Sequence, residues 1–186
     1  MIKINVIPAL LMSICAIGLS LSGCKGKLDK DVAAFTSRPI YIPENQMIKR
    51  ACSYYTDTLT QGKTLRLVNY LDMDSVGCSS CELSQLASQE AANMERKDLR
   101  KVEFVYVVKT SPEKYEASYS KLCNARLKGT VYFDTARVFL NHNPHFPSSK
   151  LFHTFVINRD GKIVIVGSPF KNEKMQKLFD KVLSKN

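Results

Sequence analysis

Two cysteines, Cys78 and Cys81, are separated by two residues where an apolar run gives way to a segment with helical spacing. At the start of a helix, unpaired N–H groups and the helix dipole stabilise a thiolate, so we expect Cys78 to be the nucleophile. Cys81 follows one helical turn later and is expected to be the more buried thiol. The pair predicts thiol–disulfide exchange, in which Cys81 resolves a mixed disulfide formed through Cys78.

A CxxC pair also occurs in zinc sites, and the chain contains three histidines, His142, His145 and His153. No second CxxC and no HxxxH pair accompanies the motif, and its place between a strand and a helix favours redox chemistry. A copper or zinc site made by Cys78, Cys81 and His153 is the alternative, because thiolates and imidazole bind both metals. We prefer His153 as a residue at the rim of the site.

A carboxylate close to the motif offers acid–base chemistry. Asp72 lies six residues before Cys78, a spacing that resembles that of the buried carboxylate of thioredoxins, and this resemblance implies that it accepts a proton from the thiol of Cys81. The same residue could instead lie exposed with Asp74 in a loop after the strand. The sequence leaves both interpretations open.

The elements that must position these side chains follow an alternating pattern of strands and helices. We expect the strand Thr64–Leu71, the helix Cys78–Leu99 and the strand Lys101–Val108, a βαβ unit. A second helix begins with Ser111 as N-cap and Pro112 at its first position, and runs to about Leu127.

The second half of the chain adds an inserted strand and helix, a hairpin and a closing helix. The expected segments are the strand Thr130–Asp134, the short helix Thr135–Asn141, two strands joined by a turn at Asn158–Gly161, and the helix Lys171–Leu183. The apolar face of that last helix is expected to contain Met175, Leu178, Phe179, Val182 and Leu183. A short edge strand is expected at Arg38–Pro43. This order predicts an α/β fold with a central mixed sheet and helices on both faces.

Three segments carry a resemblance to a known family: "LVNYL" before "GCSSC", the inserted "VYFD", and "HTFVINRDGKIVIVGSP". From Thr64 to Leu183 the chain resembles the thioredoxin-like superfamily, most closely the TlpA-like membrane-anchored branch and small thioredoxin-like bacterial lipoproteins. The resemblance implies a thioredoxin-like fold with an inserted βα element, a redox-active disulfide between Cys78 and Cys81, and no cofactor. Where such folds place a cis-proline facing the dithiol, this chain has Phe152 or His153.

The alternative within the same fold is a non-catalytic module, or a copper- or zinc-binding one similar to the Sco-type proteins. Those proteins combine this fold with a cysteine pair and a distant histidine, but their pair is spaced CxxxC. Cys52 and Cys123 could form a second disulfide or remain unpaired structural cysteines, of which we prefer the second.

The N-terminus carries targeting signals. Lys3, an apolar run and the lipobox Leu21–Cys24 predict a lipoprotein signal peptide at residues 1–23, with Cys24 as the site of palmitate attachment. An ordinary signal peptide or an uncleaved anchor is the alternative, although the run is short for a spanning helix. Residues 24–37 then form a tether, and residues 38–186 a single thioredoxin-like domain, expected to be a monomer.

Charge and export limit the partners. Without residues 1–23 the chain keeps 26 Lys and Arg, one fewer than the 27 of the whole sequence, against 17 Asp and Glu, a formal net charge of +9. This charge could favour anionic lipids or acidic partners, although we prefer ordinary solvated faces, and export argues against nucleic acid. We expect a protein of the bacterial cell envelope that faces the periplasm and exchanges electrons with thiols and disulfides of exported proteins or with an upstream membrane electron donor.

Overall fold

The computed structural model describes residues 26–50, 63–75, 80–94, 96 and 101–185. The chain divides into two units, Met1–Ser37 and Arg38–Asn186. In the first unit residues 26–36 are helical, where the sequence shows no clear period. The part of the chain that the structure describes contains no helix both long and apolar enough to cross a membrane.

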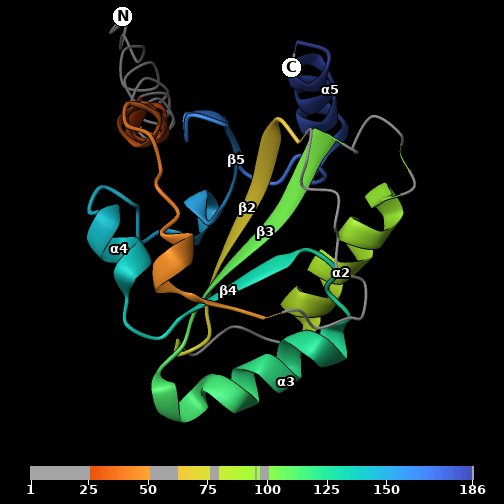
Figure 1. The fold of residues 1–186 in the computed structure, drawn as a ribbon. Helices are drawn as coiled ribbons and strands as arrows, with labels where there is room; N and C mark the ends of the chain where they lie inside the picture. The colour runs from red at the N-terminus through yellow and green to blue at the C-terminus, as the bar shows by residue number, and fades with distance from the viewer. Residues whose placement is uncertain (1–25, 51–62, 76–79, 95, 97–100, 186) are drawn as a thin grey trace, which may run out of the picture. The chain divides into compact units, whose positions relative to one another are not determined.

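The second unit is built on one mixed sheet, whose described strands follow the order β1-β4-β3-β2-β5-β6 (Figure 1). The strands are β1 (Ile48–Lys49), β2 (Leu65–Asp72), β3 (Val102–Lys109), β4 (Thr130–Asp134), β5 (Thr154–Asn158) and β6 (Ile163–Val166). β3 is parallel to β2 and to β4, whereas β5 is antiparallel to both β2 and β6, and β1 is antiparallel to β4. The predicted mixed sheet and terminal hairpin are confirmed.

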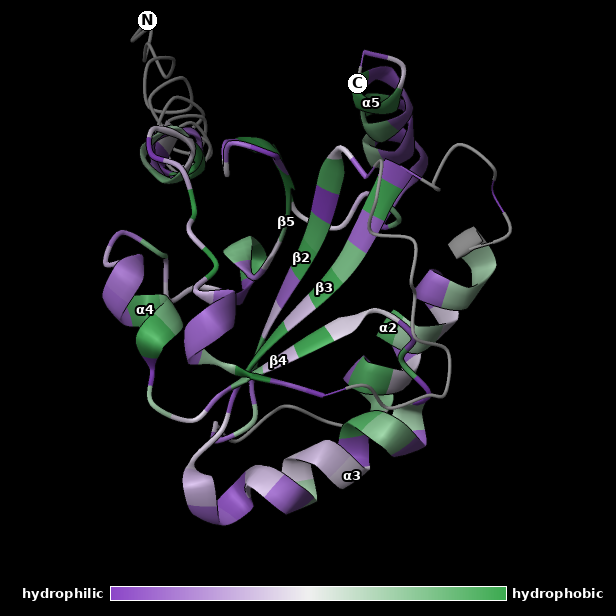
Figure 2. Cartoon of the chain, in the orientation of Figure 1, coloured by the Kyte–Doolittle hydropathy of each residue, from purple (hydrophilic) through white to green (hydrophobic). Residues whose placement is uncertain are grey.

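The two central strands are buried on both sides of the sheet. Every residue of β2 from Leu67 to Leu71 is buried, as is every residue of β3 from Val102 to Val108. Figure 2 shows hydrophobic residues along both strands, with hydrophilic ones between them. Because successive side chains of a strand point to opposite faces, such a strand needs cover on each face.

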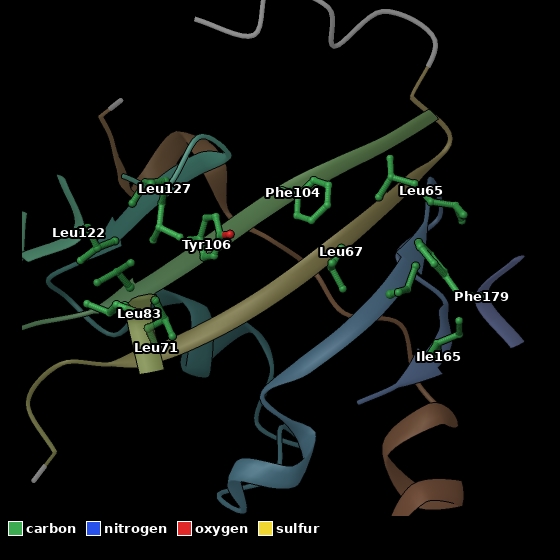
Figure 3. Packing of buried hydrophobic residues seen from close by; sticks show 14 of the residues in the cluster. Leu65, Leu67, Leu71, Leu83, Phe104, Tyr106, Leu122, Leu127, Ile165 and Phe179 are labelled. Atoms are coloured by element: carbon green, nitrogen blue, oxygen red, sulfur yellow. The ribbon is translucent and has the colours of Figure 1, made fainter. Parts of the chain in front are cut away.

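Three helices cover one face: α2 (Ser80–Met94), α3 (Tyr115–Ala125) and α5 (Glu173–Leu183). The core on this face joins strand residues such as Leu67 and Tyr106 to Leu83, Leu122 and Phe179 of the three helices (Figure 3). On the other face, the ring of Tyr70 stacks on Phe139 of α4 (Val138–His142), with centroids 5.4 Å apart. The prediction of helices on both faces is therefore confirmed.

The order of elements is the one expected from the sequence. A β2-α2-β3 unit is followed by α3, the inserted β4 and α4, the β5-β6 hairpin and α5. In the hairpin turn, Gly161 has a φ of 75°, and an added Cβ would clash with the carbonyl oxygen of Ile40. The turn thus needs the glycine that the Asp-Gly pair supplies. The fold is α/β and thioredoxin-like.

The prediction of an edge strand at Arg38–Pro43 is wrong. Pro39 and Pro43 have no N–H to donate. The N–H groups of Ile40 and Tyr41 donate to two different parts of the chain and not to one neighbouring strand: Ile40 to the Gly161 carbonyl (2.8 Å) and Tyr41 to Asn143 Oδ1 (2.9 Å). Strand pairing begins only at β1. We call Arg38–Pro43 the strap, since these bonds hold it against the hairpin turn and α4.

Two helix predictions also need correction. Leu178 was expected on the buried face of α5 but is 44% exposed, because the sheet contacts the narrower line of Met175, Phe179, Val182 and Leu183. The second predicted helix starts as a separate 3-10 turn at Pro112–Lys114, and the Ser111 side chain makes no capping hydrogen bond.

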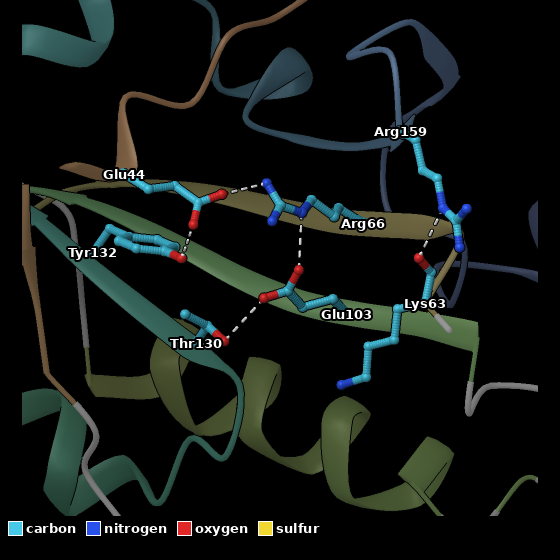
Figure 4. Close-up of polar contacts among 7 residues, drawn as sticks. All are labelled: Glu44, Lys63, Arg66, Glu103, Thr130, Tyr132 and Arg159. Carbon is cyan, nitrogen blue, oxygen red and sulfur yellow. Dashed lines mark hydrogen bonds and ion pairs between the residues drawn. The ribbon is translucent and has the colours of Figure 1, made fainter. Parts of the chain in front are cut away.

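A polar network crosses the face opposite α2 near the amino-terminal end of β2 (Figure 4). The Arg66 guanidinium donates to Glu44 Oε1 (2.6 Å) and pairs with Glu103 Oε2 (2.8 Å). Hydroxyls of Tyr132 and Thr130 donate to the remaining oxygens of these two carboxylates. Burial would raise the pKa of Glu44, but bonds from Tyr132 and Arg66 outweigh it and lower the pKa. The network therefore fixes the segment after the strap on the sheet.

We predict that Asn143→Ala destabilises the domain by about 2–3 kcal/mol. The Asn143 side chain, 1% exposed, accepts from the Tyr41 N–H and donates to the carbonyls of Tyr41 (2.7 Å) and Phe139 (2.8 Å), so its loss leaves buried polar groups unpaired. Urea denaturation measures the change. Asn141→Ala, on the exposed side of the same helix, is the control and should change the free energy of unfolding by less than about 0.5 kcal/mol. Equal effects of the two variants would contradict this role.

Candidate functional site

The carboxyl-terminal ends of the parallel strands meet at one edge of the sheet. Asp72 ends β2 and Lys109 ends β3, and the strand register places them opposite each other. Lys109 Nζ lies 2.8 Å from Asp72 Oδ2, and the two side chains are 15% and 25% exposed. Helix α2 starts eight positions after Asp72, and Cys81 is its second residue.

Asp72 organises the first turn after β2. Its Oδ1 accepts from the N–H groups of Asp74 (3.1 Å) and Ser75 (3.2 Å). Asp74 Oδ1 in turn accepts from the Ser111 N–H (3.0 Å), which links this turn to the loop after β3. Asp72 is thus the last residue of β2 and partly buried, between the buried and the exposed interpretations that the sequence leaves open.

The electrostatics of Asp72 also bear on its predicted role as a base. Burial acts to raise the pKa of this carboxyl, but the hydrogen bond and charge of Lys109 and the two backbone donors outweigh it and lower the pKa. A carboxylate with a lowered pKa is a weaker proton acceptor. Proton transfer from Cys81 to Asp72 stays a prediction, and these contacts disfavour it.

Cys81 lies in the first turn of α2, and its side chain is exposed. The sequence predicts it as the more buried thiol of the pair, and this comparison stays a prediction because it needs the placement of Cys78. Cys78 lies outside the described residues, as do Cys24 and Cys52, and the roles predicted for these three stay predictions. Cys123 is partly buried on α3.

His153, and not Phe152, lies at the rim of this edge. Phe152 is 3% exposed and points into the core, whereas His153 is half-buried and directly precedes β5. The His153 carbonyl accepts from the Tyr70 N–H (2.7 Å), which extends the pairing of β5 with β2. Every peptide bond among the described residues, including that between Phe152 and His153, is trans.

Aromatic rings surround the imidazole of His153. It packs edge-on against Tyr70 (centroids 5.1 Å apart) and stacks on Phe146 (5.6 Å). Burial among these rings lowers the pKa of His153, an effect that a hydrogen bond to the Pro147 backbone partly offsets. The charges of Asp72 and of Glu82, the neighbour of Cys81, also act on the ring. The ring is therefore neutral at neutral pH and close to the start of α2.

Within the described residues, no group of three His, Cys, Asp or Glu side chains could hold a metal ion. His142 Nε2 lies 3.4 Å from Gln46 Oε1, and the buried Nε2 of His145 has no hydrogen-bond partner among the described residues. The alternative site of Cys78, Cys81 and His153 includes a residue outside the described ones and is not tested by this observation.

Comparisons with known proteins give only partial structural overlaps. No family model and no curated protein matches the chain. The chain is similar to the solution structure of a proposed thiol-disulfide oxidoreductase from Bacteroides vulgatus, with 17% identity, a TM-score of 0.48 and coverage of 67% of this chain and 76% of that one. It is also similar to a proposed thiol:disulfide interchange protein from Chlorobium tepidum, with 15% identity, a TM-score of 0.47 and coverage of 66% and 82%.

A third match is an uncharacterized thioredoxin-like protein from Porphyromonas gingivalis, with 15% identity, a TM-score of 0.46 and coverage of 66% of this chain and 75% of that one. Overlaps of this size do not transfer an activity. The thioredoxin-like fold rests on the order and connections of the strands: a β2-α2-β3 unit, the inserted β4 and α4, and the β5-β6 hairpin followed by α5.

Sequence reasoning missed one buried titratable group, Glu90 of α2. Glu90 is only 1% exposed. Its Oε2 accepts hydrogen bonds from the Lys128 N–H (2.8 Å) and the Tyr106 hydroxyl (3.2 Å). Oε1 has no hydrogen-bond partner among the described residues. Burial raises the pKa of Glu90, an effect that these donors only partly offset. The signal was its spacing: Glu90 lies seven positions after Leu83, on the same buried side of the helix.

We predict that Glu90→Gln removes a pH dependence of stability. Because the pKa of Glu90 is higher in the folded chain than in the unfolded one, its contribution is fully present below the unfolded pKa and is lost as pH rises through the folded pKa. The free energy of unfolding of wild type should therefore fall relative to that of Glu90→Gln as pH rises from acid to neutral.

Urea denaturation across this pH range measures both proteins. Glu116→Gln is the control, since Glu116 has a side chain 75% exposed, and its effect should stay within about 0.5 kcal/mol at each pH. A constant difference between wild type and Glu90→Gln across the range would contradict the assignment.

Proposed function

We propose that this protein is a thiol-disulfide oxidoreductase that acts on exported proteins through the dithiol Cys78 and Cys81. In the reducing direction, the Cys78 thiolate attacks a partner disulfide, forms a mixed disulfide and releases one partner thiolate. The Cys81 thiolate then attacks the sulfur of Cys78, which forms the Cys78–Cys81 disulfide and releases the second partner thiolate. Two electrons pass from the dithiol to the partner, and the reverse sequence oxidises a partner dithiol.

The observation that carries this proposal is the place of Cys81. It is an exposed thiol in the first turn of α2, the helix that follows the central strand of the sheet. The first turn of a helix is where backbone N–H groups remain unpaired and favour an anion. An exposed sulfur at this position is available for exchange chemistry, and its role as the resolving thiol rests on its place as the second cysteine of the CxxC pair.

The edge of the sheet around α2 supports the same chemistry. His153 is neutral there at neutral pH, so its ring adds no positive charge to a partner that approaches the dithiol. Lys109 is engaged by Asp72, so the two charges offset each other. Exchange needs no metal or organic cofactor, because the electrons are held by the two sulfur atoms.

The proposed location follows from the N-terminal sequence. A lipid on Cys24 would hold the domain at a membrane of the cell envelope, with residues 24–37 as a connection. Proteins exported to this compartment form disulfides, which gives an envelope oxidoreductase its substrates.

We predict that Cys81→Ser traps a mixed disulfide between Cys78 and partner proteins in cells, because the resolving thiol is absent. Non-reducing electrophoresis after acid quenching should show species of higher mass that disappear with dithiothreitol. Cys123→Ser is the matched control and should show none, and the double variant Cys78→Ser/Cys81→Ser should lose them. If Cys81→Ser gives no trapped species, the proposed exchange mechanism is wrong.

We predict that Cys24→Ala abolishes lipid attachment. Metabolic labelling with palmitate, followed by immunoprecipitation, should label wild type and leave the variant unlabelled, while Cys123→Ser is labelled like wild type. Equal label in wild type and Cys24→Ala would remove the lipoprotein proposal without affecting that of thiol exchange.

A further inference from the structure

The outer side of α5 carries a row of lysines around one exposed leucine. Met175, Phe179 and Leu183 face the core, while Lys174, Lys177, Leu178, Lys181 and Lys185 are all exposed. We call these five exposed residues the lysine face. Figure 2 shows that α5 has both hydrophilic and hydrophobic bands.

The spacing of these residues places them together. Positions 174, 178, 181 and 185 are three or four residues apart, so they follow one line along the helix, with Lys185 in the turn after its end. Leu178, 44% exposed, lies between Lys174 and Lys181 on this line. Long lysine stems beside an exposed leucine make a surface that is apolar close to the helix and cationic at its tips.

The charge of this segment is not neutralised by its own acids. Residues 171–185 contain five lysines and two acidic residues, Glu173 and Asp180, a net charge of +3. Glu173 pairs with Lys177 (2.7 Å) and Asp180 with Arg96 (2.8 Å). Lys174 and Lys181, on either side of Leu178, therefore remain without a carboxylate from α5 itself.

We propose that the lysine face docks on a bilayer surface rich in anionic lipids. Lysines near such a surface are attracted by its negative potential, and an exposed leucine can enter the boundary between headgroups and acyl chains. The segment from Lys171 to Lys185 contains lysine and no arginine. Compact ammonium charges suit a diffuse planar field, whereas bidentate recognition of protein carboxylates favours arginine. These observations favour lipid over an acidic protein.

This docking is separate from the proposed redox chemistry and from the lipid anchor. A chain that lacked either property would still present the lysine face. Where all three hold, the docking would orient the domain on the membrane, because α5 would lie against the lipid headgroups.

The chain contains no tryptophan, so Leu178→Trp provides a single fluorescent reporter on the lysine face. We would reconstitute the full chain on vesicles of phosphatidylcholine alone, and on vesicles that also contain phosphatidylglycerol. On the anionic vesicles, the emission of Leu178→Trp should shift to shorter wavelength and be quenched by lipids with brominated acyl chains. High salt should reverse both changes, because it screens the attraction.

The matched reporter is Ser120→Trp on the exposed side of α3, which should respond equally to both kinds of vesicle. Adding Lys174→Glu and Lys181→Glu to the Leu178→Trp chain should abolish the shift. Adding Lys114→Glu and Lys121→Glu, the same charge change away from α5, should retain it. Loss of the shift in both pairs of substitutions would mean that the net charge of the chain causes the binding, and it would overturn the proposal that the lysine face docks on the bilayer.

Two further outcomes would also overturn the proposal. The first is an emission of Leu178→Trp that is the same on neutral and anionic vesicles. The second is a shift with soluble polyglutamate but not with anionic vesicles, which would assign the lysine face to an acidic protein partner.

Discussion

The pairing of β2 on both of its edges is the constraint on which the rest of the domain depends. β3 pairs with all eight residues of β2 from one side, and β5 pairs with five of them from the other. A strand enclosed in this way has no edge of its own, and its burial on both faces requires helices above and below the sheet. Its carboxyl end is therefore held at a fixed point, and the turn at residues 73–75 follows from that point.

The contacts around this point tie three separate loops together. Asp72 pairs with Lys109 of β3 and accepts hydrogen bonds from the turn that follows β2. Asp74 accepts a hydrogen bond from the loop after β3. The carbonyl of His153, the residue before β5, accepts a hydrogen bond from Tyr70 of β2. Further along α2, Glu90 holds the helix to Lys128, just before β4, and to Tyr106 of β3. Helix α2 is thus positioned by polar contacts as well as by its apolar side, at the cost of burying one carboxyl group with a raised pKa.

Much of the fold could be predicted because strong local patterns agree with the tertiary structure. Apolar runs gave β2 and β3, and the Asp-Gly pair gave the hairpin turn at Gly161. The strap could not be predicted from its apolar residues, because its bonding depends on Gly161 and Asn143, more than 100 residues away in the sequence. Leu178 fits the apolar pattern of α5, but it is exposed because the contact between the helix and the sheet is too narrow to include it. Of the candidate site, the packing of His153 on Tyr70 and Phe146 depends on residues distant in the sequence, and the ion pair of Asp72 with Lys109 required the register of two strands.

The central claim is that Cys78 and Cys81 form one two-electron redox couple, and an equilibrium redox titration tests it most directly. The protein would be equilibrated with a series of ratios of reduced to oxidised glutathione, alkylated, and analysed by peptide mass spectrometry. Our account predicts that the two cysteines become alkylated together in one transition that follows a two-electron Nernst curve. In the Cys78→Ser variant Cys81 should lose this transition. If Cys78 and Cys81 are alkylated independently, or remain fully alkylated under oxidising conditions, the protein is not a dithiol oxidoreductase.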